Sequence, residues 1–259
     1  MSNLPQIVKI IKDNIAYFDQ YYQSKIFDTY NIGLIDFNNI DGSEINALKL
    51  FYFSLTTRQR TSNNPINDND RENIKNIVLN VLKTLNDVNL GIEQRYFLSL
   101  RELNTVRGAG PKIITMYIKF LISHSVNLQD KEKLMKILWI PLDIHLIKFL
   151  SQSYYGNHGK LIEPARFRLF DRPINPILFN LSINQDGTPN TNNEYFIVQE
   201  IIRKRFIEEN IPEPPIILDH LWVIGSARCI HTKFSELISC YGCPFNNGKA
   251  ICAQERLII

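Results

Sequence analysis

The sequence predicts an all-α protein, and three observations lead to this class. Apolar residues recur at steps of three and four through several segments of helical length, a spacing that places them on one face of an α-helix. Stretches containing glycine or proline separate these segments. The 259 residues are 44% hydrophobic and 11% aromatic, so the helices have enough apolar surface for one large domain or two small lobes.

Composition says little about partners. The net charge of +3 and the pI of about 8.6 permit an anionic partner without requiring one. No apolar run reaches the length of about eighteen residues that a membrane helix needs, and the first residues lack the basic and apolar regions of a signal peptide. We therefore expect an intracellular protein with no membrane partner.

The first half of the chain predicts three amphipathic helices. Residues 1–44 contain a helix over 4–30 and then a loop. A second helix is expected over 45–57, with Ser43 as its N-cap, and a third over 70–85. Their apolar positions are Ile7, Ile10, Ile11, Ile15, Phe18 and Tyr22 in the first, Leu48, Leu50, Phe51, Phe53 and Leu55 in the second, and Ile74, Ile77, Val78, Val81, Leu82 and Leu85 in the third.

A helical hairpin is the centre of a core domain predicted over 45–150. One helix runs toward Arg107, Gly108 and Gly110 then permit a tight turn with unusual dihedral angles, and a second helix starts at Lys112. The free N–H groups that open the second helix suit a phosphate. The alternative is an ordinary helix connection with a solvated lysine. The apolar residues of the two helices are Leu100, Leu103 and Val106, then Ile113, Ile114, Met116, Tyr117, Phe120 and Leu121.

An acidic residue follows the hairpin in an apolar setting. Asp143 lies 31 positions after Lys112, in the sequence Pro-Leu-Asp-Ile-His that ends at His145. The residues between them, over 127–139, predict an added helix.

Residues 151–215 are an insertion followed by a helix. Several prolines forbid long helices in its first part, and a helix resumes over 194–210. The basic triplet 203–205 on that helix could contact phosphates, although a solvated face is the simpler interpretation.

The last domain, residues 216–259, starts with a helix and carries all four cysteines. Their spacing is C-x10-C-x2-C-x8-C, and clustered thiols in an intracellular chain indicate a metal more than disulfides. Four thiolates hold either a [4Fe–4S] cluster or zinc, and spacing alone does not decide between them. The four are Cys229, Cys240, Cys243 and Cys252.

These motifs together resemble the helix-hairpin-helix DNA glycosylases, the superfamily of endonuclease III. Residues 106–112 are similar to the family's hairpin, residues 142–145 to its acid motif, and residues 240–248 to the sequence C-x-x-C-P-L-x-x-G of its iron–sulfur loop. Arg107 stands where the family usually has proline, and the interval from Lys112 to Asp143 is longer than in most members.

The resemblance implies a two-lobed fold with a C-terminal cluster loop, in which the helix within 1–44 packs on the C-terminal lobe. It implies a [4Fe–4S] cluster, with zinc as the runner-up, and a monovalent cation at the hairpin. The partner would be double-stranded DNA with a damaged base, bound by a monomer. Contacts to DNA would come from Gln59, Arg60, Arg107, Gly108 and Gly110.

The implied activity is that of a base-excision glycosylase with AP lyase activity. Lys112 would attack the sugar as a neutral amine and form a Schiff base, and Asp143 would stabilise positive charge and assist proton transfer. Oxidised bases are the favoured substrates. The alternatives are a monofunctional glycosylase, a non-catalytic iron–sulfur DNA-binding protein and a zinc-stabilised interaction module.

Overall fold

The computed structural model describes residues 4–56, 68–142, 146–147, 167–169, 172–175 and 178–223. Helices make up most of this part, so the all-α prediction is confirmed. None of the helices in these ranges is both long and apolar enough to cross a membrane. The chain divides into two compact units, one of residues 22–141 and 180–197 and the other of residues 1–21, 142–179 and 198–259.

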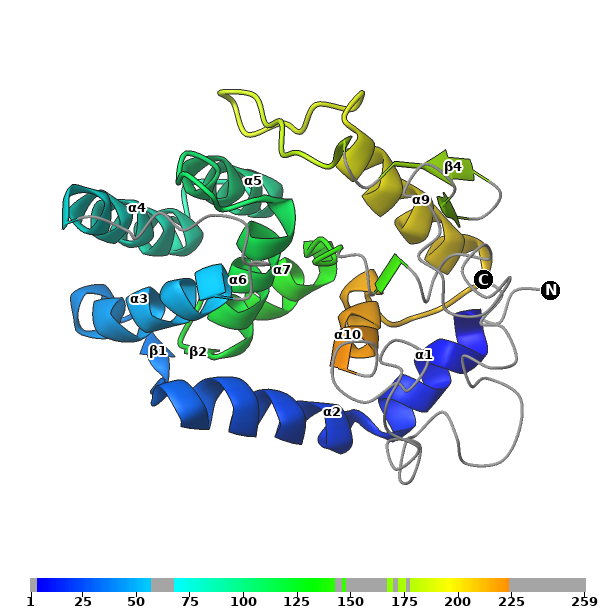
Figure 1. Ribbon diagram of the computed structural model, residues 1–259, viewed down its shortest axis with the longest axis horizontal. Coiled ribbons are helices and arrows are strands. Elements are labelled where there is room, and N and C mark those ends of the chain that lie inside the picture. Colours follow the sequence, from blue (N-terminus) through cyan, green and yellow to red (C-terminus); the bar gives the residue numbers. More distant parts are fainter. Residues whose placement is uncertain are drawn as a thin grey trace. The chain divides into compact units, whose positions relative to one another are not determined.

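The larger unit is built around helix α6 (Pro111–Ser123), whose residues from Ile113 to Ile122 are all buried. Helices α3 (Ile40–Thr56), α5 (Ile92–Leu103) and α7 (Lys131–Ile137) pack against it, and α4 (Asp68–Asn86) packs on α3 and α5. Figure 1 shows α6 among α3, α5 and α7. Because α6 forms the core, the turn at its N-terminus is fixed to the most buried helix of the unit.

Short strands supplement the helices. In the larger unit, β1 (Ile35–Asp36) pairs in parallel with β2 (Ser125–Val126). In the other unit, β3 (Phe167–Leu169) and β4 (Arg172–Ile174) form an antiparallel pair. These strands are too short to change the fold class.

The smaller described unit brings the two ends of the described chain together. Helix α1 (Leu4–Asp13) packs against the 3-10 helix η4 (Pro215–His220), and the α10 helix (Leu221–Val223) follows. Phe18 contacts His220 edge-to-face, with ring centroids 5.5 Å apart, and Lys12 forms an ion pair with Glu213. The helix predicted from residue 216 is therefore a 3-10 helix in its first part.

The predicted single helix over 4–30 is wrong, because the chain breaks at Asn14. The Asn14 side-chain amide donates to the carbonyl of Ile10 over 2.9 Å, which competes with the regular helical ladder. The chain continues as α2 (Ile15–Tyr22) and the π-helix η1 (Gln23–Asp28). Asparagine in a run of apolar helical spacing is the signal that indicates this break.

The predicted N-cap at Ser43 is also wrong. Helix α3 begins at Ile40, so Ser43 lies inside it, where its buried hydroxyl accepts a hydrogen bond from the backbone N–H of Asp36 over 2.6 Å. Asn39 is the cap, since its side-chain oxygen accepts the N–H of Gly42 over 3.0 Å. By contrast, the helices expected over 70–85, 127–139 and 194–210 are confirmed as α4, α7 and α9 (Glu194–Glu208).

The polar segment before α9 lies against α5. A turn closes where the N–H of Asn184 donates to the carbonyl of Thr188 over 2.8 Å. Arg101 of α5 donates to the carbonyl of Gln185 over 2.6 Å, and Asn104 to that of Leu181 over 3.2 Å. This part of the predicted insertion is thus fixed to the helix that leads into the hairpin.

Candidate nucleic-acid interface and active site

The turn between α5 and α6 has its own internal hydrogen bonds. The N–H of Val106 donates to the carbonyl of Leu103, and the N–H of Ala109 to that of Val106, both over 3.0 Å. The side chains of Val106 and Ala109 are buried, whereas Arg107 is exposed. The turn is therefore anchored by two small apolar side chains and presents its charged residue outward.

The two glycines predicted in the turn have different backbone conformations. Gly108 has a φ of 88°, in the left-handed region that favours glycine. Gly110 has φ −81° and ψ 173°, an extended conformation open to any residue, so the expectation of unusual dihedral angles at both positions is wrong for Gly110. A Cβ added at Gly110 would meet nothing within 4 Å among the described residues. This space would allow a ligand to approach the backbone of Gly110 closely.

The N-terminus of helix α6 has the features of an anion-binding site. Gly110 is the N-cap, Pro111 occupies the first helical position, and Lys112 follows in the first turn with a half-buried side chain. The first intrahelical bond runs from the N–H of Ile114 to the carbonyl of Gly110 over 3.1 Å. The N–H groups of residues 112 and 113 therefore precede any intrahelical acceptor. They lie on a 13-residue helix, where the macrodipole adds positive potential.

Two buried hydroxyls connect this first turn to the segment before the acid motif. Thr115 Oγ1 lies 2.8 Å from the carbonyl oxygen of Pro111 and 3.0 Å from Tyr195 Oη. Tyr195 Oη donates to the carbonyl of Ile140 over 2.9 Å. Tyr195 and Ile140 are fully buried and Thr115 is 1% exposed. Helix α6, α9 and the end of the Lys112–Asp143 interval thus meet at one polar contact inside an apolar core.

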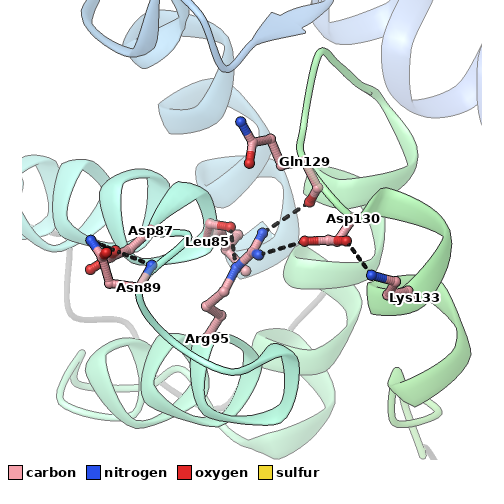
Figure 2. A network of polar contacts seen from close by, with 7 residues as sticks. All are labelled: Leu85, Asp87, Asn89, Arg95, Gln129, Asp130 and Lys133. Atoms are coloured by element: carbon pink, nitrogen blue, oxygen red, sulfur yellow. Dashed lines mark hydrogen bonds and ion pairs between the residues drawn. The ribbon is translucent and has the colours of Figure 1, made fainter.

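The rest of that interval is fixed by a buried arginine (Figure 2). Arg95 of α5 is 1% exposed and donates three hydrogen bonds: to the carbonyls of Leu85 and Gln129, each over 2.9 Å, and to Asp130 Oδ2 over 3.1 Å. Lys133 donates to the other carboxylate oxygen of Asp130 over 2.7 Å. This hydrogen bond, with a smaller contribution from Arg95, lowers the pKa of Asp130.

Arg95 therefore joins the end of α4 to the loop that introduces α7, a helix that lies between Lys112 and Asp143 in the sequence. The loop has an unusual backbone, since Asp130 has a φ of 58°. Sequence reasoning missed Arg95, Thr115 and Tyr195. Arg95 is one of four charged residues of α5, and nothing in the local sequence marks it as the buried one. Nothing in the sequence pairs Thr115 with Tyr195.

The remaining expected site residues lie outside the described residues. These are Gln59, Arg60, Asp143 and the four cysteines Cys229, Cys240, Cys243 and Cys252. The described ranges hold no group of three or more His, Cys, Asp or Glu side chains arranged as metal ligands. The hairpin residues Arg107, Gly108, Gly110 and Lys112 are brought together at one turn, as expected.

Comparison of the chain with protein-family models, curated proteins and solved structures finds no match.

Proposed function

We propose that the protein is a DNA glycosylase with AP lyase activity that removes an oxidised base from duplex DNA. The observation that carries the proposal is the geometry of the α5–α6 turn. A left-handed Gly108, an open and extended Gly110, and Lys112 in the first turn of a buried helix lie within five residues. The resemblance of the acid motif and of the cysteine tail to the same glycosylase superfamily supports it.

The hairpin would bind one phosphate of the DNA backbone. The N–H groups that open α6 point out of the helix end, and the missing side chain at Gly110 leaves room for the phosphate oxygens. Arg107 is exposed on the same turn and adds positive charge. Such contacts hold the duplex in register without reading sequence. A monovalent cation bridging the turn and the phosphate, and Gln59 and Arg60 at the flipped nucleotide, belong to the same proposal.

The chemistry would use Lys112 and Asp143. The neutral Nζ of Lys112 attacks C1′ of the sugar, and the glycosidic bond breaks with its electron pair on the base. The proton that the nitrogen loses passes through Asp143 to the departing base. Opening of the sugar ring gives a Schiff base; loss of a C2′ proton then breaks the C3′–O bond, whose electron pair leaves with the 3′ phosphate. Asp143 also stabilises the positive charge that develops on the sugar.

The four cysteines would hold a [4Fe–4S] cluster, since four thiolates are the usual ligand set for it. A cluster bound there stabilises the fold of the C-terminal loop. Every reaction step described above depends only on Lys112 and Asp143.

Borohydride trapping tests the proposal. The full-length protein is incubated with duplexes carrying thymine glycol, 8-oxoguanine or a preformed abasic site. We expect a covalent adduct that Lys112→Gln abolishes while duplex binding persists. Lys83→Gln, which changes an exposed lysine of α4, is the matched control and should trap normally. Asp143→Asn should slow base release by roughly a hundredfold. Trapping by Lys112→Gln at the normal level would show that another amine is the nucleophile. Absence of an adduct with the wild-type protein would leave a monofunctional enzyme or a DNA-binding protein.

A further inference from the structure

Residues 181–190 form a two-stranded ribbon in the larger unit. The N–H of Asn184 donates to the carbonyl of Thr188 over 2.8 Å, which closes the turn of the ribbon. Within that turn, Asp186 Oδ1 accepts the N–H of Thr188 over 2.9 Å and its hydroxyl over 2.7 Å. The ribbon is therefore ordered by hydrogen bonds of its own, and it can support the element that it contacts.

The ribbon packs along one face of α5. The residues of this face follow one another at steps of three and four along the helix: Gln94, Leu98, Arg101 and Asn104. Gln94 Nε2 donates to the carbonyl of Asp186 over 3.4 Å, and Arg101 Nη1 donates to that of Gln185. A Cβ added at Gly187 would lie 3.1 Å from Cγ of Leu98, so the backbone of the ribbon lies directly on the helix.

Asn104 is the residue of this face that lies nearest the hairpin turn. It is the C-cap of α5, where its N–H donates to the carbonyl of Leu100 over 3.0 Å and its side-chain amide donates to that of Leu181. Packing of Val106 and Ala109 holds the turn itself, whereas the Asn104 bond holds the residue at which the chain enters the turn.

The composition of the ribbon favours a supporting role over contact with phosphates. Residues 181–190 contain one carboxylate, Asp186, and no lysine or arginine, so their charge does not attract DNA. The hydrogen bonds from α5 end on backbone carbonyls of the ribbon. The ribbon therefore offers α5 a fixed row of acceptors and offers DNA no positive charge.

We propose that the ribbon supports the phosphate-binding turn: by bonding one face of α5 as far as Asn104, it holds the hairpin N–H groups in place before DNA binds. The inference rests on the proposed function. It assigns a role to part of the insertion, to which the sequence motifs assign none. A loop that is already ordered loses less conformational entropy on binding, so it binds more tightly through the same contacts. Asn104 is thus a positioning residue, which acts on DNA only through the turn.

Asn104→Leu tests the proposal, because it removes the amide and changes no charge. Hydrogen exchange of peptides covering 104–112, measured without DNA, should speed up by about fivefold. Affinity for a duplex carrying a tetrahydrofuran abasic analogue, measured by fluorescence anisotropy, should fall by about fivefold. A merely structural contact would lower the unfolding temperature and leave the affinity unchanged at temperatures far below it.

Gly187→Ala breaks the same contact from the side of the ribbon. The φ of 85° is strained for alanine, and the new Cβ would push the ribbon away from Leu98. This variant should also speed exchange of the hairpin amides, although Gly187 is remote from them in sequence. Gln185→Leu is the matched control: it replaces an exposed amide side chain and keeps the carbonyl that Arg101 bonds, so it should change neither exchange nor affinity.

Normal exchange at 104–112 in both Asn104→Leu and Gly187→Ala would overturn the supporting role and leave the proposed function untouched. Weaker duplex binding by Gln185→Leu at normal exchange would overturn it as well, because it would show that the ribbon contacts DNA directly. A wild-type chain that neither binds the duplex nor forms an adduct would reject the proposed function, and the supporting role in DNA binding with it.

Discussion

Arg95 Nη1 and Asp130 Oδ2 lie 3.1 Å apart, and this ion pair joins α5 to a loop that follows it by 35 positions in sequence. The guanidinium is almost fully buried, while the carboxylate side chain is 31% exposed. The arrangement lets Asp130 keep contact with water while Arg95 satisfies two backbone carbonyls inside the core. The contact is therefore part of the core although a charged residue makes it. We expect loss of the arginine to raise the free energy of the folded state more than loss of the partly exposed carboxylate.

We predict that Arg95→Met destabilises the protein by about 3 kcal/mol, because the carbonyls of Leu85 and Gln129 are left without their donor. Urea unfolding followed by circular dichroism measures this. Lys133→Met is the control, since Lys133 bonds the same Asp130 but is 68% exposed, and it should cost less than about 1 kcal/mol. Equal losses in the two variants would contradict the assignment of Arg95 as a core residue.

A second prediction concerns pH and His124. The imidazole stacks on Phe27 with ring centroids 3.9 Å apart, and burial lowers the pKa of His124 from its ordinary value of about 6.5. Because the folded state holds the proton less well than the unfolded chain, unfolding takes up a fraction of a proton below pH 6.5. Stability is therefore full above that pH and falls as the pH drops toward the folded-state pKa.

Thermal unfolding at pH values from 5.0 to 7.5 measures this loss, and His124→Gln should flatten the curve in that window. The carboxylates whose pKa is lowered, Asp130, Asp186 and Glu213, also favour the folded state at higher pH, but their contribution is lost only at more acidic pH. A wild-type curve as flat as that of His124→Gln between pH 5.0 and 6.5 would rule out this origin.

The sequence predicted the parts of the fold that depend on local spacing. The apolar stripe of α4 and the hairpin glycines are local signals, and both elements lie where they were expected. The cap of α3 was misplaced because Asn39 and Ser43 are both good capping residues, and only the fold shows which of them bonds the helix end.

The polar contacts inside the core were not predictable from local spacing. From the sequence alone, Arg95 is expected to be an exposed residue of an amphipathic helix, because its partners lie as many as 35 positions away. Tyr195 and Thr115 are 80 positions apart, and no periodicity links them. Such contacts depend on tertiary packing, which is why the hairpin could be found from the sequence and its supporting residues could not.

The cysteine tail gives a prediction that needs no structural detail. Purified anaerobically, the protein should be brown and carry about four irons per chain, held by Cys229, Cys240, Cys243 and Cys252. Cys243→Ser should lower the iron content and the yield of folded protein more than it alters the choice of damaged base. If elemental analysis finds stoichiometric zinc and no iron, the four cysteines hold a structural zinc ion and not an iron–sulfur cluster.

The last prediction separates the two hairpin glycines. Gly108→Ala should destabilise the fold by roughly 1–2 kcal/mol, because the φ of 88° is strained for a residue with a Cβ. Gly110→Val should leave the fold nearly as stable as wild type, since its backbone is extended and a Cβ there meets nothing within 4 Å among the described residues. If a phosphate approaches Gly110, the same substitution should weaken binding to every duplex by about tenfold, a loss measured by fluorescence anisotropy at several salt concentrations.

Gly91→Val is the matched control for that loss. Gly91 is the N-cap of α5, with φ −62° and ψ 154°, and within the described part of the chain a Cβ added there also meets nothing within 4 Å. The two glycines thus share their place in a helix and their local space, and differ in whether DNA is proposed to touch them. Gly110→Val should weaken duplex binding and Gly91→Val should not. Equal affinities for the two variants, at equal thermal stability, would show that the backbone of the hairpin is not the phosphate site.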